Sequence, residues 1–186
     1  MLKVNATIRI ENVVASATLK QRVDLNAVVK GYPGVEYRPE QFPGLVFRLK
    51  RPKTATLIFN SGKMVCTGAK SEKESRRAVM RVVKELKGSG IIIISKPELK
   101  IQNIVASANL GGLIDLEKAA YILGKTMYEP EQFPGLIYRM AVPKVVILLF
   151  ASGKLVCTGA KKEQYVYEAV SKLHQELEEK ELIFYE

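Results

Sequence analysis

Alternating apolar and polar positions near the start of the chain predict a strand. Over residues 4–10 an apolar side chain stands at every second position, at Val4, Ala6, Ile8 and Ile10. A period of two is typical of a strand that has one covered face. Asp24 is a favourable N-cap residue, and it predicts a short helix over Leu25 to Val29.

Three short apolar segments follow and predict three further strands. These segments are Leu45 to Leu49, Thr54 to Phe59 and Lys63 to Thr67. Phe42-Pro43-Gly44 precedes the first segment and Ser61-Gly62 separates the last two, and both motifs contain residues that favour turns. The pattern therefore predicts a small antiparallel sheet after the first helix.

A longer amphipathic helix is predicted after the last of these strands. Ser71 and Glu74 have the spacing of a capping box, which satisfies backbone N–H groups at a helix start. An apolar stripe at helical spacing follows, at Val79, Val82, Val83 and Leu86.

The whole pattern occurs twice, with an offset of 91 residues. Ile10 to Leu19 returns as Ile101 to Leu110, and Tyr37 to Lys70 aligns without a gap to Tyr128 to Lys161, with 22 of 34 positions identical. Asp115 would cap a helix over Leu116 to Leu123. The second apolar stripe is Val166, Ala169, Val170, Leu173 and Leu177.

Two copies of this length predict two pseudo-equivalent halves rather than a solenoid. We expect repeats over residues 1–90 and 91–186, joined near Lys87-Gly88-Ser89-Gly90. The predicted fold is α+β, with one curved antiparallel sheet shaped like a saddle and four helices on its convex face.

The charge is concentrated in one half of the chain. The 186 residues carry a formal net charge of +10, with 18 Lys and Arg against 7 Asp and Glu in residues 1–90 and 11 against 12 in the remainder. Such a field suits a polyanionic partner, although a well-solvated surface explains it as well. No apolar run approaches the length of a membrane span, no leader is evident, and two cysteines indicate reduced thiols in an intracellular protein.

The predicted strands are apolar on both faces, so one layer of helices cannot cover them. Residues 145–150 contain no polar position. An apolar free face indicates a binding surface or a dimer interface, and a strand buried on both faces is the alternative. Alternation places one set opposite Ile58 and Cys66: Leu57, Phe59, Val65 and Thr67, with the copies Leu148, Phe150, Val156 and Thr158.

Paired cations frame this set: Arg48 and Arg139, Lys53 and Lys144, Lys63 and Lys154, Lys70 and Lys161. An apolar surface with basic edges, duplicated about a pseudo-dyad, fits a quasi-symmetric polyanion. Double-stranded DNA approached from its minor groove is such a ligand.

Catalytic chemistry has little support in the sequence. The segment Ser61-Gly62-Lys63 is not a P-loop, because Leu57 and Met64 stand where Gly and Ser or Thr are required. No Cys and His cluster has zinc spacing. Cys66 and Cys157 are expected to be buried thiols, and His174, the single histidine, is expected to be structural or solvent-facing. We therefore expect neither an enzyme nor a cofactor.

Several repeated motifs resemble the core of the TATA-box-binding protein family over essentially the whole chain. They are EQFPGLVFR and EQFPGLIYR, LIFNSGKMVCTGAK and LLFASGKLVCTGAK, and the Asn-Val-Val-Ala-Ser and Asn-Ile-Val-Ala-Ser pair. Since no long amino-terminal extension precedes them, the chain resembles the archaeal form.

The resemblance implies a role for each matching residue. Phe42, Phe59, Phe133 and Phe150 match the rings that wedge between base steps. Residues that match contacts to base edges are Asn12, Asn103, Thr67, Thr158, Val14, Val105, Leu57, Leu148, Val65 and Val156. The eight cations above match phosphate contacts. Such proteins bind chiefly by DNA shape and deformability.

The resemblance also implies partners and a compartment. Arg38 in the first copy becomes Glu129 in the second, and Glu129 and Glu131 match the docking loop for transcription factor B, unless they are merely solvated charges. The expected function is a general transcription initiation factor that binds and bends TATA-box DNA and reaches RNA polymerase indirectly. It would be cytoplasmic and nucleoid-associated, or nuclear in a eukaryote, with a possible homodimer in the free state.

Three alternatives to this function remain open. The apolar face could serve a protein-interaction scaffold that dimerises, or a general minor-groove architectural protein. The chain could also be the accessory domain of a DNA-repair enzyme, although few residues remain for a catalytic domain.

Overall fold

The computed structural model describes residues 6–186, and the chain divides into two compact units. We call residues 12–102 the N-terminal unit, and residues 103–186 together with 6–11 the C-terminal unit. The predicted strand residue Val4 lies outside the described residues. The division of the sequence into repeats over 1–90 and 91–186 stays a prediction.

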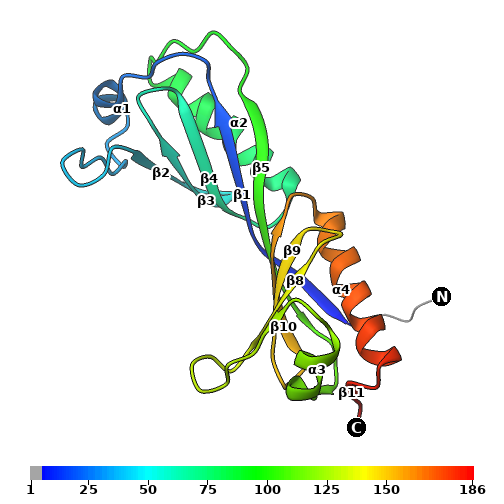
Figure 1. Cartoon of the computed structure of the whole chain (residues 1–186). Helices are drawn as coiled ribbons and strands as arrows, with labels where there is room; N and C mark the ends of the chain where they lie inside the picture. Colours follow the sequence, from blue (N-terminus) through cyan, green and yellow to red (C-terminus); the bar gives the residue numbers. More distant parts are fainter. Residues whose placement is uncertain (1–5) are drawn as a thin grey trace. The chain divides into compact units, whose positions relative to one another are not determined.

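The N-terminal unit contains a sheet with two helices. Its elements are β1 (Thr7–Thr18), which begins in the other unit, α1 (Leu25–Gly31), β2 (Leu45–Lys50), β3 (Lys53–Ile58), β4 (Lys63–Ala69) and α2 (Glu72–Gly88). The strands have the order β2-β3-β4-β1, and each pairs antiparallel with its neighbour. Figure 1 shows α2 on one side of these strands, and it packs on β2, β3 and β4.

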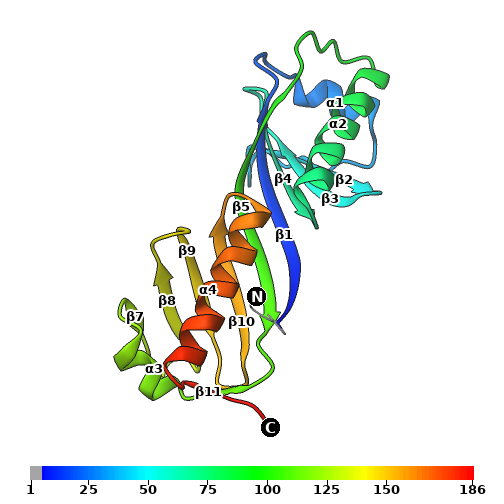
Figure 2. The same cartoon turned by 90° about the vertical axis from the view of Figure 1, so that its right-hand side faces the viewer.

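The C-terminal unit repeats this arrangement and adds short strands. Its elements are β5 (Glu98–Asn109), whose first residues belong to the other unit, β6 (Leu113–Ile114), α3 (Leu116–Ile122), β7 (Thr126–Met127), β8 (Leu136–Met140), β9 (Val145–Leu149), β10 (Lys154–Ala160), α4 (Glu163–Glu179) and β11 (Ile183–Phe184). Here the order is β5-β10-β9-β8-β7. Figure 2 shows α4 along one side of β8, β9 and β10.

These elements confirm the predicted α+β class with four helices. Within the described residues, nine strands follow the hydrogen-bonded order β2-β3-β4-β1-β5-β10-β9-β8-β7, and β6 and β11 form a separate pair. None of the described helices is long and apolar enough to cross a bilayer.

Side-chain caps begin three of the four helices. The Oδ1 atoms of Asp24 and Asp115 accept hydrogen bonds from the backbone N–H groups of Ala27 and Lys118, at 3.2 and 3.0 Å. Ser71 Oγ accepts one from Glu74 N at 2.9 Å. These contacts confirm the predicted helix starts.

The fourth helix, α4, begins differently. Lys162 occupies its N-cap position without a side-chain cap, and the Nζ atom of Lys162 instead lies 5.6 Å from the ring centroid of Tyr165.

The helical stripes form the cores of the two units. All the apolar stripe residues predicted for α2 and α4 are buried. They lie over the covered sheet face, where Phe47, Thr56 and Cys66 are cross-strand neighbours in one unit and Tyr138, Ile147 and Cys157 in the other. The predicted burial of both thiols is confirmed.

The first strand is longer than predicted. Alternation of large apolar residues ends at Ile10, yet β1 continues to Thr18. Its inward positions beyond Ile10 are Val13, Ala15 and Ala17, all buried, and small side chains there leave room for the helical layer. The covered face therefore continues through residues whose size gave a weak hydrophobic signal.

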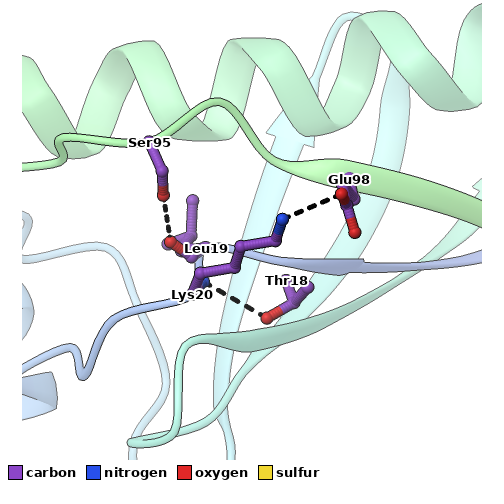
Figure 3. Close-up of polar contacts among 5 residues, drawn as sticks. All are labelled: Thr18, Leu19, Lys20, Ser95 and Glu98. Atoms are coloured by element: carbon purple, nitrogen blue, oxygen red, sulfur yellow. Dashed lines mark hydrogen bonds and ion pairs between the residues drawn. The ribbon is translucent and has the colours of Figure 1, made fainter.

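The segment between α2 and β5 is tied to the end of β1 (Figure 3). Ser95 Oγ donates a hydrogen bond to the carbonyl oxygen of Leu19, and Lys20 Nζ lies 2.8 Å from Glu98 Oε1. Lys20 has a positive φ of 55°, and its backbone N–H donates to Thr18 Oγ1 at 3.3 Å. Side chains of Ser95 and Glu98 thus hold the residues that directly follow β1.

Candidate nucleic-acid interface

The sheet face away from α2 in the N-terminal unit carries a half-exposed apolar row. Cross-strand pairing aligns Val46 with Leu57, Leu57 with Val65, and Val65 with Ser16. Each of these residues is half-buried, whereas the sequence neighbours of Leu57 and Val65 on the covered face are buried. We call this surface the open face of the unit. The predicted assignment of Leu57, Val65 and Thr67 to it is confirmed.

The C-terminal unit presents the equivalent open face. Ile137, Leu148, Val156 and Ser107 form its row through the same cross-strand pairing. Val14 and Val105 are half-buried, as are Thr67 and Thr158. Cross-strand neighbours point to the same side of a sheet, so each row is continuous.

Two phenylalanines pack against each other beside each open face. The Phe42 and Phe59 ring centroids lie 5.9 Å apart at an interplanar angle of 70°, and Phe133 and Phe150 lie 5.8 Å apart at 71°. Phe42 and Phe133 are 42% and 38% exposed. The resemblance predicts that Phe42 acts with Phe59 and Phe133 with Phe150, and the structure brings both pairs into contact.

A glycine in each Phe-Pro-Gly turn makes the edge-to-face contact possible. A Cβ atom on Gly44 would lie 2.7 Å from Phe42 Cε1 and 3.0 Å from Phe59 Cε1. On Gly135 it would lie 2.8 and 3.0 Å from the same atoms of Phe133 and Phe150. Side chains at these positions would push the rings apart, so the turns favour glycine for packing.

The two asparagines are held in one orientation by backbone N–H groups. Asn12 Oδ1 accepts a hydrogen bond from Gly68 N at 2.7 Å, and Asn103 Oδ1 accepts one from Gly159 N at 2.6 Å. The amide nitrogens face the threonines, with Asn12 Nδ2 at 3.1 Å from Thr67 Oγ1 and Asn103 Nδ2 at 3.2 Å from Thr158 Oγ1. Because a backbone N–H requires an acceptor, the amide cannot turn over.

Bulges deliver these N–H groups. The pairing register shifts between Val13 and Ala15 on β1 and between Cys157 and Ala160 on β10. Gly68 and Gly159 have φ angles of +102° and +97°, a region that favours glycine. The bulged backbone therefore offers its N–H to a side chain of the neighbouring strand.

All eight predicted phosphate-contact cations are exposed. Arg48 and Arg139 belong to the open faces, since their cross-strand neighbours lead to Thr67 and Thr158. Arg48 Nε also lies 3.8 Å from Glu36 Oε1, with both side chains more than 60% exposed. A contact between two such exposed groups leaves Arg48 available to another anion.

Glu129 and Glu131 lie exposed in the loop before Phe133. The carbonyl oxygen of Glu129 accepts the backbone N–H of Phe133 at 3.0 Å, as that of Arg38 accepts the N–H of Phe42 at 2.9 Å. The two loops thus share a backbone turn and differ in charge.

The two cysteines lie on the covered faces of the sheet, and His174 belongs to α4, the helix that packs on the C-terminal unit. Burial raises the pKa of the Cys157 thiol to about 11, and it also raises the pKa of Cys66, where the Thr56 and Thr54 hydroxyls oppose the shift. His174 is buried with Nε2 2.6 Å from the Tyr185 hydroxyl, and is structural rather than solvent-facing. Burial and the Glu178 carboxylate raise the pKa of Tyr185 to about 12.

Sequence reasoning missed several residues that complete the open faces. Val46, Ile137, Ser16 and Ser107 complete the rows, and the alternation of β1, β2 and their copies could have found them. The roles of Gly68 and Gly159 depend on bulges that no local pattern marks. Residues 6–186 contain no cluster of His, Cys, Asp and Glu that could hold a metal ion.

Comparisons with known proteins agree with this geometry. A family model described as transcription factor TFIID (or TATA-binding protein, TBP) matches residues 7–88 and 98–180. The TATA-box-binding proteins of Sulfurisphaera tokodaii and Aeropyrum pernix are 57% and 53% identical to this chain, over 94% and 95% of it and over 88% and 87% of their own lengths. The structure of Methanococcus jannaschii TBP matches with a TM-score of 0.83 at 50% identity, covering 92% of this chain and 98% of that one. This chain therefore belongs to the TATA-binding protein family of transcription factors.

Proposed function

We propose that this chain is a general transcription initiation factor that binds TATA-box DNA in the minor groove and bends it. Each open face would read one half of a quasi-symmetric site. Family membership agrees with the expectation of a DNA-binding factor rather than an enzyme. Proteins that bend DNA from the minor groove insert apolar side chains between base steps, and the exposed phenylalanines beside these faces suit that mode of binding.

The orientation of the two asparagines carries this proposal. With Oδ1 accepting from a glycine N–H, each amide places its Nδ2 group beside a threonine hydroxyl. One of the two Nδ2 hydrogens serves the threonine, and the second can donate to DNA. In the minor groove A·T pairs offer only acceptors, whereas G·C pairs add an N2 amino donor. Fixed donors on the open faces therefore favour A·T pairs.

The apolar rows support the same preference. Leu57, Val65, Leu148 and Val156 present methyl groups that can pack on the smooth groove floor of A·T pairs. The N2 amino group of guanine would lie against these methyl groups without a hydrogen-bond partner. Burying an unpaired polar group costs about 1–3 kcal/mol.

The phenylalanine pairs would kink the duplex. Exposed rings beside each row can insert between base steps, and flexible TA steps reduce the unstacking energy. The exposed cations around them would contact phosphates, which adds affinity without sequence preference. We assign Glu129 and Glu131 to the contact with transcription factor B, which would in turn recruit RNA polymerase. The protein would act in the cytoplasm, associated with the nucleoid.

Two substitutions in the same unit separate these roles. Phe150→Ala should lower affinity for a TATA duplex and reduce its bend. Lys154→Ala should weaken binding to all DNA sequences alike. It should also reduce the slope of log affinity against log salt concentration by about one unit. Gel-shift assays over a series of salt concentrations measure the affinity of each variant. The same assays with duplexes that place the site at different distances from a fixed bend measure the DNA bend, and together they distinguish the two variants. Identical behaviour of both variants would contradict the assignment.

The partner assignment has its own test. Glu129→Arg should leave binding to TATA DNA unchanged and weaken the ternary complex with the factor, because the charge reversal makes this loop resemble the Arg38 loop. Glu40→Arg, in the equivalent loop of the other copy, is the matched control. An unchanged ternary complex would exclude the assignment, and lost DNA binding alone would place the loop on the DNA surface.

A further inference from the structure

Glu11 and Gln102 occupy equivalent positions, each directly before one of the asparagines, and they differ in charge. Each bonds a serine of its open face, but with the donor and acceptor roles reversed. We propose that Glu11 and Gln102 make the two faces read different minor-groove patterns, and so orient the protein on its site. The inference rests on the proposed function. It assigns the orientation to a residue pair that the DNA-contact residues above do not include.

Glu11 and Gln102 hold the serines at the end of each apolar row. Ser16 pairs with Val65, and Ser107 pairs with Val156. Both serines line shallow hollows on the surface of their own unit. Ser16 lies with Thr18, Lys63 and Lys100, and Ser107 lies with Phe150, Lys154 and Val156. Each serine therefore occupies the surface that would face DNA.

The hydroxyl of Ser107 is committed as a donor. Ser107 Oγ lies 2.7 Å from Glu11 Oε1, and an ionised carboxylate accepts hydrogen bonds but donates none. The hydroxyl proton must point to Glu11, and only oxygen lone pairs remain for a ligand.

The hydroxyl of Ser16 has the opposite role. Gln102 Nε2 donates to Ser16 Oγ at 2.7 Å, so the oxygen already accepts a hydrogen bond. Within residues 6–186 Ser16 Oγ donates no hydrogen bond, so its proton can be offered to an acceptor outside the protein. Serines at matched positions thus present a donor in the N-terminal unit and an acceptor in the C-terminal unit.

This difference matches the one difference that the minor groove offers. A·T pairs present only acceptors there, and a purine N2 amino group adds a donor. Ser16 should favour a half-site without that group. Ser107 should tolerate the amino group or bind it, because its lone pairs can accept the N2 hydrogen. The difference between the two serines therefore places the C-terminal unit over the half-site that carries the amino group.

A self-complementary alternating T·A duplex with 2,6-diaminopurine replacing adenine in one half tests the proposal. The substitution adds an N2 amino group and leaves base pairing intact. Orientation can be measured by DNA cleavage from an iron chelate attached through Asn60→Cys, in the turn after Phe59, or through Ala151→Cys in the matching turn. The natural cysteines are buried, so labelling is confined to the introduced thiol.

We expect the wild-type residues at 11 and 102 to place the C-terminal unit on the modified half about tenfold more often than on the other, as one hydrogen bond predicts. Glu11→Gln should remove the preference, because both serines then donate. Gln102→Glu should remove it as well, because both then accept. The double exchange Glu11→Gln with Gln102→Glu should reverse it.

Other outcomes would overturn the proposal. If Glu11→Gln raises affinity for every duplex and leaves the orientation ratio unchanged, Glu11 acts through charge alone. If Ser107→Ala retains the wild-type ratio, the serine does not read the base. Failure of the unsubstituted protein to bind the unmodified T·A duplex would instead refute the proposed function, and the inference with it.

Discussion

The two units have the same open face, but the cores, helix caps and sheet edges around it differ. The phenylalanine pairs agree within 0.1 Å and 1°, at 5.9 and 5.8 Å and at 70° and 71°. The asparagine contacts to Gly68 and Gly159 also agree within 0.1 Å. Beneath these features the units diverge in their cores, helix caps and sheet edges.

The divergence is clearest under the sheet. Buried Thr56 and Ser75 in the N-terminal unit correspond to Ile147 and Val166 in the other, and neither hydroxyl makes a hydrogen bond of good geometry within the described residues. At the sheet edge, β7 pairs with β8, whereas β2 has only the isolated bridge between Glu36 and Val46. The outward surface of α2 is basic, and that of α4 contains Glu168, Glu178 and Glu179.

This comparison separates the role that the two units share from the features in which they differ. Under the proposed function, a quasi-symmetric duplex requires the same contacts from both units, which would explain why the phenylalanine pairs and the asparagine contacts are matched. The helical side meets no such requirement and can differ between the units. Differences on the open face itself, as at Glu11 and Gln102, are then the ones that bear on how the protein reads its site.

The largest expected effect comes from the asparagine contacts that the units share. Asn12→Asp and Asn103→Asp keep an acceptor for the glycine N–H but replace the Nδ2 donor with a negatively charged oxygen. Each should lower affinity for TATA DNA by about 10- to 100-fold, equivalent to about 1.5–3 kcal/mol. Fluorescence anisotropy measures the affinity, and thermal unfolding checks that the fold is kept. A large loss in one unit with none in the other would break the comparison.

Substitutions at the equivalent core positions Thr56 and Ile147 should change stability in opposite directions. Thr56→Val removes a poorly satisfied buried hydroxyl and should stabilise the protein by about 1 kcal/mol, whereas Ile147→Thr places one in an apolar core and should destabilise it by about 2 kcal/mol. Urea unfolding measures both. If Ile147→Thr stabilised the protein, the core of the C-terminal unit would not require an apolar residue at this position, which would contradict the prediction.

The smallest expected effect concerns alkaline pH. Free thiols ionise near pH 9, and burial holds the pKa of Cys157 at about 11, so the folded state keeps a proton that the unfolded state loses. Stability should therefore fall as the pH rises from 9 to 11. Cys157→Ala should reduce this fall more than Cys66→Ala, because threonine hydroxyls oppose the rise that burial causes in the pKa of Cys66. Urea unfolding at pH 8 and pH 10 compares them, and equal effects would contradict the difference.

Most of the fold could be predicted because the sequence contains two copies of the same pattern, which can be compared with each other. The repeat located the matching strands, both helical stripes and the uncovered face. The extension of β1 beyond Ile10 could not be predicted, because Ala15 and Ala17 are too small to show strong alternation. The strands β6, β7 and β11 have two residues each and depend on partners distant in sequence.

The candidate site could be predicted as a set of residues but not as a hydrogen-bonded arrangement. Alternation grouped Leu57 with Val65, and the resemblance added Asn12. The contact of Asn12 with Gly68 requires a bulge across two strands separated by 56 positions. The contrast between Glu11 and Gln102 is visible in the sequence, but its meaning depends on serines from other strand segments.

Competition among three duplexes tests the central claim most directly, namely that the open faces bind TATA DNA through the minor groove. The duplexes are a TATA site, the same site with inosine·cytosine replacing A·T, and the same site with G·C. Inosine·cytosine resembles A·T in the minor groove but not in the major groove. We predict that the first two compete almost equally and the third at least about tenfold less well. Equal competition by G·C, or failure of the inosine·cytosine duplex alone, would contradict the account.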